Sequence, residues 1–264
     1  GRSYKTLIRT GVPTVAFRSA NEGGVGVKSA YENRNVETFI VNPFWDVDVA
    51  VADSHEDGAA ALIAQEADGS MEGAFVTLCK QMYYGIGTGG DAKGFPGLIA
   101  TVDSGMVVDA GGTTADTCSS VWAVKFGPKF SQWVWGQNGQ LALSDVRFKD
   151  VLDADNNPFT AYHQELMAYP GFQVLNKFSV ARIKKLTADA GKGLTDSLVA
   201  DLISKFPSGY VPDVLFASRR SISQLQKSRT ATSETGRPAP FPTESHGIPI
   251  LSTDAILETE ALTL

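Results

Sequence analysis

Residues 54–84, SHEDGAAALIAQEADGSMEGAFVTLCKQMYY, contain the pattern that decides the fold. Apolar side chains recur there every three or four residues, which places them on one face of a helix. Ser54 followed by Asp57 resembles a capping box, so we expect the helix to begin at this point. Carried from His55 to Tyr83, it would be about 40 Å long. The residues expected to pack along its apolar face are Ile63, Ala67, Met71, Phe75, Leu78 and Met82.

The residues before this helix alternate between apolar and small or polar side chains in two stretches, 12–17 and 45–51. Alternation with a period of two predicts strands. Between these stretches lies a polar, glycine-rich excursion, residues 18–35, which is far longer than the ~2–5 residues of an ordinary hairpin loop. Long loops inside compact domains are usually functional or disordered. We therefore expect this loop to bind something or to contact a partner.

The region after the helix predicts further elements in a definite order. A glycine-rich stretch at 85–97 predicts a flexible loop, and residues 119–183 predict a sizeable, mainly antiparallel sheet with a hairpin signal at Asn138-Gly139. The elements expected after the sheet are a helix over 194–206, a buried strand over 211–217, a helix capped by Ser218, an exposed proline-rich loop over 229–246 and a strand over 247–251. The mixture predicts an α+β protein in which no repeat or linker separates independent domains.

The composition argues against several classes of function. The 264 residues carry 23 basic and 29 acidic side chains, a net charge of -6, which does not suit a surface that neutralises many nucleic-acid phosphates. Only Cys79 and Cys118 are present, too few for a disulfide framework or a four-ligand zinc site. No apolar run approaches the ~20 residues of a membrane-spanning helix. We expect no cofactor, no metal and no membrane contact.

Several motifs resemble chemical sites, and each has a simpler explanation. The glycines of 85–90 match the letters of a dinucleotide fingerprint, but they follow a helix where that motif needs a strand. Residues 153–157 have the spacing of a calcium loop without its turn glycine, which favours a polar hairpin turn. Cys118 has no identifiable base. The histidines, His55, His163 and His246, are scattered, and we expect each on the surface or in a loop.

Three tryptophans, Trp122, Trp133 and Trp135, follow each other within the predicted sheet. Exposed tryptophans on a sheet can form a platform on which sugar rings stack. Aromatic side chains are also the usual residues of protein cores and subunit interfaces. We favour the core or interface interpretation for all three.

Several stretches together resemble the major capsid proteins of tailed bacteriophages with the Hong Kong 97 capsid fold. These stretches are 9–18 (RTGVPTVAFR), 21–23 (NEG), 95–98 (FPGL), 109–113 (DAGGT), 120–127 (SVWAVKFG), 247–250 (GIPI) and 257–260 (LETE). They occur in the order expected for a subgroup of that family, and together they span almost the whole chain. The resemblance therefore does not depend on a single motif.

The resemblance implies a purpose for the long loop and the long helix. The loop would be the extended loop that lies across a neighbouring subunit, and the helix would be the spine helix. The contact residues implied in and beside the loop are Arg18, Glu22, Lys28, Glu32 and Arg34. The implied divisions are an N-terminal segment with the extended loop (1–50), a peripheral domain with the spine helix and a sheet (51–185), and an axial domain with the C-terminal segment (186–264). Because the strand block precedes the axial unit, we expect a rearranged, permuted connectivity.

The resemblance also implies a structural and non-enzymatic function. Subunits of this family self-assemble into pentamers and hexamers of an icosahedral virion capsid that encloses double-stranded DNA. Assembly would take place in the cytoplasm of the bacterial host, with scaffolding, decoration and portal proteins as further partners and with weak, non-specific contact to the packaged DNA. Some relatives crosslink subunits through a lysine in the extended loop, the position of Lys28, but no partner asparagine or catalytic acid can be assigned here.

Three alternatives remain open. Another virion protein, such as a decoration or tail subunit, would share the strand-rich pattern but rarely needs so long a helix beside an extended loop. A small-molecule enzyme would need convergent acid, base and nucleophile positions that the sequence does not display. A carbohydrate-binding module would use the tryptophans, and quenching of their fluorescence by sugars would reveal it.

Overall fold

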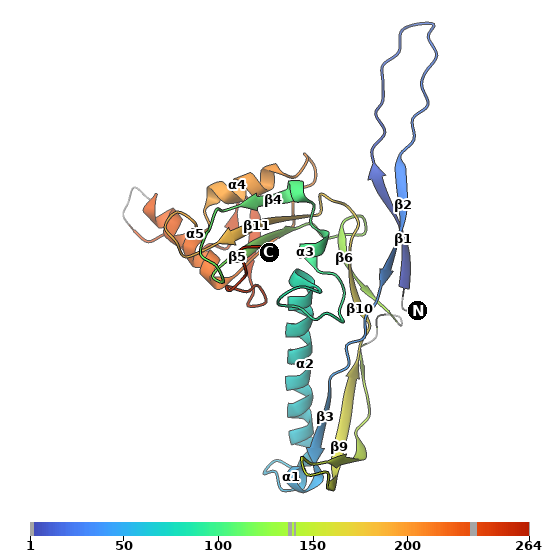
Figure 1. Cartoon of the computed structure of the whole chain (residues 1–264), viewed down its shortest axis with the longest axis vertical. Coiled ribbons are helices and arrows are strands. Elements are labelled where there is room, and N and C mark those ends of the chain that lie inside the picture. Colours follow the sequence, from blue (N-terminus) through green and yellow to red (C-terminus); the bar gives the residue numbers. More distant parts are fainter. Residues whose placement is uncertain (1–2, 137–138, 140, 233–236, 264) are drawn as a thin grey trace.

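The computed structural model describes residues 3–136, 139, 141–232 and 237–263. The molecule is elongated (Figure 1). A body of sheet and helices carries a long helix that leaves it in one direction, and a β-hairpin projects in the opposite direction. Helices and strands are mixed along the chain, as expected for an α+β protein.

The body is built on a six-stranded sheet with the strand order β13-β14-β12-β5-β11-β4. All six residues of the central strand β5 are buried, because both faces of the sheet are covered. Helices α4 (Asp196–Ser204) and α5 (Arg219–Ala231) cover one face. The strands are β4 (Val107–Asp109), β5 (Ser119–Val124), β11 (Val180–Leu186), β12 (Val214–Ala217), β13 (Glu244–Ser245) and β14 (Ile248–Ser252).

The prediction of a single sheet over residues 119–183 is wrong, because the strands of this block belong to three sheets. β5 pairs with the later strand β12, and β11 pairs with the earlier strand β4. The predicted domain boundary at residue 185 therefore passes through the six-stranded sheet. The other strands of the block are β6 (Ser131–Trp135) and β10 (Pro170–Val174), which pair with each other, and β7 (Ala142–Leu143), β8 (Arg147–Leu152) and β9 (Pro158–Met167), which form a sheet with β3 (Phe44–Asp48). Pairing between distant segments is not encoded in strand propensity. The hairpin signal at Asn138 lies outside the described residues.

The long helix, α2, is confirmed. It covers Ala59–Tyr84, which is 26 residues, or about 39 Å. The helix passes through Gly69 and Gly73 without interruption. Figure 1 shows its N-terminal half beside β3 and β9 and its C-terminal end entering the body.

The start of α2 differs from the prediction. Its N-cap is Gly58, and the predicted capping box does not form. Ser54 instead ends a short helix, α1 (Val49–Asp53), and its hydroxyl donates to the carbonyl of Val51 at 2.9 Å. The Asp48 carboxylate accepts from an amide in the first turn of α1. Because α1 begins directly after this cap, the predicted strand 45–51 ends at Asp48.

The glycine-rich segment after α2 is packed against the helix, so the predicted flexible loop is wrong. The Gln81 side chain donates to the carbonyls of Asp91 at 3.0 Å and Phe95 at 2.8 Å, and it accepts from the Asp91 amide at 2.7 Å. A Cβ on Gly97 would lie 2.3 Å from the amide nitrogen of Gly85. Glycines therefore allow two backbone segments to touch. The short helices α3 (Leu98–Thr101) and η1 (Ser104–Met106) follow.

The projecting hairpin consists of β1 (Ser3–Gly11) and β2 (Ala30–Glu37), joined by residues 12–29. The strand predicted over 12–17 is wrong, because the ladder ends at the pair Gly11–Ala30. Pro13 has no N–H to donate, and the apolar side chains of this stretch have no covering layer in the described chain. Alternation alone does not make a strand without a partner.

The C-terminal predictions are mostly confirmed. The Ser218 hydroxyl accepts from the Ser221 amide at 3.2 Å and caps α5, and the predicted last strand appears as β14. The exposed loop predicted over 229–246 is shorter than expected. Helix α5 continues to Ala231, and Ser245 is buried, where its hydroxyl donates to Asp196 at 2.6 Å. Residues 233–236 of this loop lie outside the described part of the chain.

Candidate functional site

The hairpin exposes apolar side chains in the segment that joins its strands. Phe17 is fully exposed, and Val12, Val15 and Val25 are 73%, 75% and 83% exposed. Single exposed apolar residues are ordinary, but a group of them on one projecting element marks an interaction surface. The hairpin is therefore a candidate contact surface.

The five predicted contact residues all lie on this hairpin, and the structure brings two of them together. The Arg18 guanidinium donates to the main-chain carbonyl of Glu22 at 2.6 Å, while the Glu22 carboxylate accepts from the Ser19 amide at 3.0 Å. These bonds form a turn at the tip. Lys28 is exposed in the connecting segment, and Glu32 and Arg34 are exposed on β2. Their contacts with a neighbour remain a prediction.

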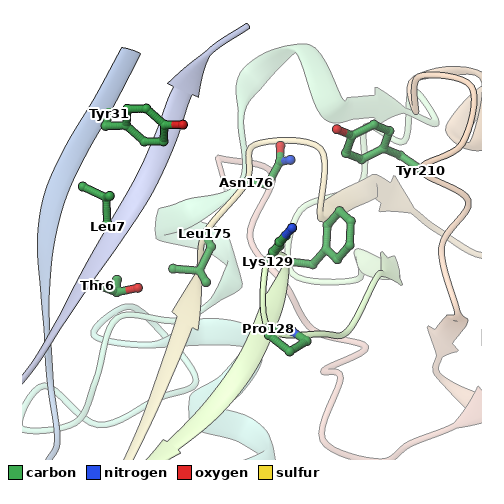
Figure 2. Close-up of a pocket in the computed structure, with 9 residues that line it drawn as sticks. Thr6, Leu7, Tyr31, Pro128, Lys129, Leu175, Asn176 and Tyr210 are labelled. Atoms are coloured by element: carbon green, nitrogen blue, oxygen red, sulfur yellow. The ribbon is translucent and has the colours of Figure 1, made fainter. Parts of the chain in front are cut away.

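Main-chain contacts hold the base of the hairpin, and a pocket lies between the hairpin and the body. The Phe39 amide donates to the carbonyl of Pro170 at 2.9 Å, and a Cβ on Gly171 would lie 2.7 Å from the carbonyl oxygen of Glu37. Figure 2 shows Thr6, Leu7 and Tyr31 of the hairpin facing side chains of the body. The pocket between them has a volume of about 340 Å³, and its body side is lined by Pro128, Lys129, Phe130, Leu175, Asn176 and Tyr210.

The apolar face of α2 is covered only near its C-terminal end. Leu78 is buried, whereas Ile63 and Met71 are half-buried and Phe75 is 51% exposed. The predicted stripe therefore packs within the chain at one end only. The uncovered part lines an open groove of about 680 Å³ between α2 and the sheet of β7 and β9. The groove is lined by Ala59, Ala60, Ile63, Ala64, Ala67, Asp68, Met71, Leu143, Val146, Tyr162 and Gln164.

A buried polar network, which the sequence did not reveal, joins α2, the six-stranded sheet and the C-terminal segment. The Glu260 carboxylate accepts from the hydroxyls of Tyr84 and Ser120, each at 2.6 Å, and pairs with Arg182 at 3.1 Å. The Tyr84 hydroxyl in turn accepts from the Leu257 amide at 2.7 Å. Burial and the nearby Glu260 carboxylate raise the pKa of Tyr84 far above its ordinary value, so its hydroxyl stays neutral.

Arg220 at the start of α5 fastens the same C-terminal segment. Its amide donates to the Glu258 carboxylate at 3.1 Å, and its guanidinium donates to the Glu258 carbonyl at 3.2 Å and the Thr117 carbonyl at 2.7 Å. In the sequence, the only signal for this arrangement is two acidic residues within an apolar C-terminal stretch. Their partners are 38 or more residues away along the chain.

The motifs that resembled chemical sites have structural explanations. The Asp153 carboxylate accepts from the amides of Asp155 and Asn157 at 2.9 and 2.8 Å, which forms the predicted polar turn between β8 and β9. His163 is buried against Asp46, so its predicted surface position is wrong. Burial raises the pKa of the Cys118 thiol, which opposes formation of a nucleophilic thiolate.

The tryptophans divide between core and surface. Trp122 is completely buried, and the Arg182 guanidinium lies 5.1 Å from its ring. Trp133 and Trp135 are stacked with ring centroids 6.2 Å apart, and Trp135 is 38% exposed.

Among the described residues, no cluster of three or more histidine, cysteine or acidic side chains could hold a metal ion. Within the same residues, no helix combines the length and apolar character needed to cross a membrane.

Several solved structures have a fold similar to that of this chain. A chain from the structure of bacteriophage Epsilon15 matches 99% of this chain and 84% of its own length, with 23% sequence identity and a TM-score of 0.67. More distant matches come from Mycobacterium phage Adephagia, with 12% identity, 69% and 85% coverage and a TM-score of 0.46, and from Myoviridae phage XM1, with 10% identity, 70% and 86% coverage and a TM-score of 0.45. No curated protein matches this sequence.

A body sheet, a long helix and a projecting hairpin in this arrangement form the Hong Kong 97-type capsid fold. The family model described as Major capsid protein GP7 matches residues 1–263, so the chain belongs to this family of major capsid proteins. The predicted fold and the predicted function as a structural capsid subunit are confirmed. The protein is a component of the virion and associates with copies of itself.

Proposed function

We propose that this capsid subunit forms rings of five and six copies that close an icosahedral shell around double-stranded DNA. The observation that carries the proposal is the hairpin, which projects from the body with Val12, Val15 and Phe17 exposed. A hairpin of this kind has no use in an isolated subunit. Contacts between two different surfaces of neighbouring copies close rings locally and a shell globally.

In this proposal, each part of the chain has a place in the shell. The hairpin, including Arg18, Glu22, Lys28, Glu32 and Arg34, lies across the neighbouring copy. The six-stranded sheet with α4 and α5 forms the axial region near the centre of each ring. Helix α2 and the sheet of β3 and β9 form the peripheral region, and the connectivity is rearranged relative to the commoner capsid order. We place the boundary outside the six-stranded sheet and not at residue 185, because β5 and β11 belong to that sheet.

We propose that assembly occurs in the host cytoplasm, with scaffolding, decoration and portal proteins as further partners. The net charge of -6 supports a container that holds DNA by weak, non-specific contact, because a shell without a large positive charge does not bind phosphates tightly. The role is structural and includes no catalysis. A densely basic inner face in the assembled shell would contradict the DNA part of the proposal.

Electron microscopy combined with sedimentation tests the assembly. The full-length protein, produced with its scaffolding partner, is expected to give closed particles or rings of five and six copies. Deletion of residues 12–29 removes the exposed apolar segment and is expected to leave subunits that fold but do not form closed particles. If the intact protein stays monomeric under every assembly condition, the proposal is wrong.

A further inference from the structure

The pocket of about 340 Å³ between the hairpin and the body, here called the hairpin recess, is rich in hydrogen-bond donors. Figure 2 shows the hydroxyls of Tyr31 and Tyr210 directed toward each other across it, with the Lys129 ammonium and the Asn176 amide group between them. The side-chain oxygen of Asn176 accepts from the Phe178 amide at 3.0 Å, so the NH₂ group is the part that can serve a ligand. These groups offer several donors to one small space.

The positive charge of the recess is not neutralised by the chain itself. Among the residues that the structure describes, no aspartate or glutamate lines the recess, and no ion pair includes the exposed Lys129. The neighbouring Lys125 differs, because it is paired with Asp213 and donates to the Val211 carbonyl. A free ammonium surrounded by further donors is complementary to an anionic acceptor.

The remaining lining of the recess is apolar and selects among anions. Leu7 and Leu175 lie on its two sides, and the ring of Phe130 packs edge-on against Tyr210 with ring centroids 5.6 Å apart. A phosphate or sulfate ion would lose hydration against such walls without gaining contacts. A carboxylate on an apolar group places its two oxygens on the donors and its carbon atoms on the walls. The volume lies within the range of about 300–1,000 Å³ that is usual for small-ligand pockets.

We propose that the hairpin recess binds a carboxylate carried on a short apolar group, whose oxygens accept from Lys129 and Tyr210 and whose carbon atoms contact Leu7 and Leu175. The bound group contacts the hairpin and the body at once, and it therefore holds the hairpin against the body. The site belongs to a single subunit and does not depend on the proposed assembly. Its ligand is either a free small carboxylate or the acidic side chain of another protein.

Titration of dissociated full-length subunits with isocaproate tests the site. The readout is the NMR signals of isotope-labelled leucine methyl groups. Saturable shifts are expected for Leu7 and Leu175, while Leu143 on β7, outside the recess, should not shift. Isohexyl alcohol has the same carbon skeleton without the charge and should bind at least about tenfold more weakly. Absence of saturable shifts with isocaproate, or tighter binding of inorganic phosphate, would overturn the proposal.

Matched variants identify the groups that hold the carboxylate. Lys129→Met keeps the length of the side chain and should weaken isocaproate binding by about tenfold or more. Lys227→Met makes the same change of charge at an exposed position of α5, outside the recess, and should leave binding unchanged. Tyr210→Phe removes only a hydroxyl and should weaken binding several-fold. Equal loss in the two lysine variants would mean that the net charge attracts the probe and that the recess is not its site.

Acetylation of Lys129 in assembled particles, followed by mass spectrometry, distinguishes the two sources of ligand. Protection of Lys129 on assembly, with no further effect of isocaproate, would identify the acidic side chain of a neighbouring protein. Acetylation that persists in particles and is suppressed by isocaproate would identify a free carboxylate. A Lys129 that reacts equally in subunits and particles, with and without isocaproate, would contradict the site. If no particles form, the proposed assembly fails, while the titration of dissociated subunits still decides the site.

Discussion

The guanidinium of Arg182 lies 3.1 Å from the carboxylate of Glu260, and both side chains are almost completely buried. Arg182 belongs to strand β11 of the body sheet, and Glu260 belongs to the C-terminal segment. Because Glu260 also accepts from Tyr84 at the end of α2, one carboxylate connects the spine helix, the sheet and the C-terminus. This connection ties the C-terminal end of the long helix to the body.

Replacing Glu260→Gln should destabilise the folded subunit. The substitution leaves Arg182 as a buried charge without its counter-ion, which typically costs about 3–5 kcal/mol. The measurement is the free energy of unfolding in urea, or the transition temperature of assembled particles. The control is Asp254→Asn, which breaks the exposed pair with Arg219 and should cost no more than about 1 kcal/mol. Equal effects of the two substitutions would show that the buried network does not hold the C-terminus.

Two glycine substitutions near α2 should have opposite effects. In Gly97→Ala, the new Cβ would lie 2.3 Å from the Gly85 nitrogen and 2.8 Å from the Gln81 carbonyl oxygen, so the packed loop must open. A Cβ at Gly69 meets nothing within 4 Å, and alanine there should stabilise the helix by about 1 kcal/mol. Thermal unfolding of the two variants checks both signs. A neutral Gly97→Ala variant would contradict the packing around Gln81.

Two positions on the apolar face of α2 should separate folding from assembly. Leu78 is 6% exposed, and Leu78→Ala should reduce stability by about 2–5 kcal/mol because a cavity remains in the core. Phe75 is 51% exposed, and Phe75→Ala should change the stability of dissociated subunits by less than about 1 kcal/mol. Its effect should appear in the yield of closed particles, measured by sedimentation. Normal particle yield for Phe75→Ala would place this residue outside the subunit contacts.

The pair of Asp196 and Arg229 predicts a dependence of stability on pH. The Arg229 guanidinium donates two hydrogen bonds of 2.7 Å to Asp196 and holds the pKa of that carboxyl below its ordinary value. A lowered pKa in the folded state gives stability that is present above the unfolded pKa of about 3.9 and is lost as pH falls through the folded pKa. The wild type should therefore exceed Asp196→Asn in transition temperature near pH 6, and the difference should shrink below about pH 4. A difference that does not change with pH would contradict the ion pair as its source.

The local elements of this protein could be predicted from its sequence. The long helix follows from apolar residues such as Ile63, Met71 and Leu78, and the cap of α5 follows from Ser218, because helix periodicity and capping depend on residues within a few positions of each other. The strands over residues 119–183 follow from local propensity in the same way. The family resemblance depended on the order of short motifs along the chain.

The arrangement of these elements was decided only by the tertiary structure. Strand β5 pairs with β11 and β12, and Glu260 meets Tyr84, Ser120 and Arg182, through contacts between segments far apart in the chain. Such contacts depend on which surfaces fit together, and no local pattern records that. The same reason explains why the sequence predicted a contact loop at residues 18–35 but not the groove beside Met71. A groove exists only where two distant elements, α2 and the sheet of β7 and β9, lie side by side without filling the space between them.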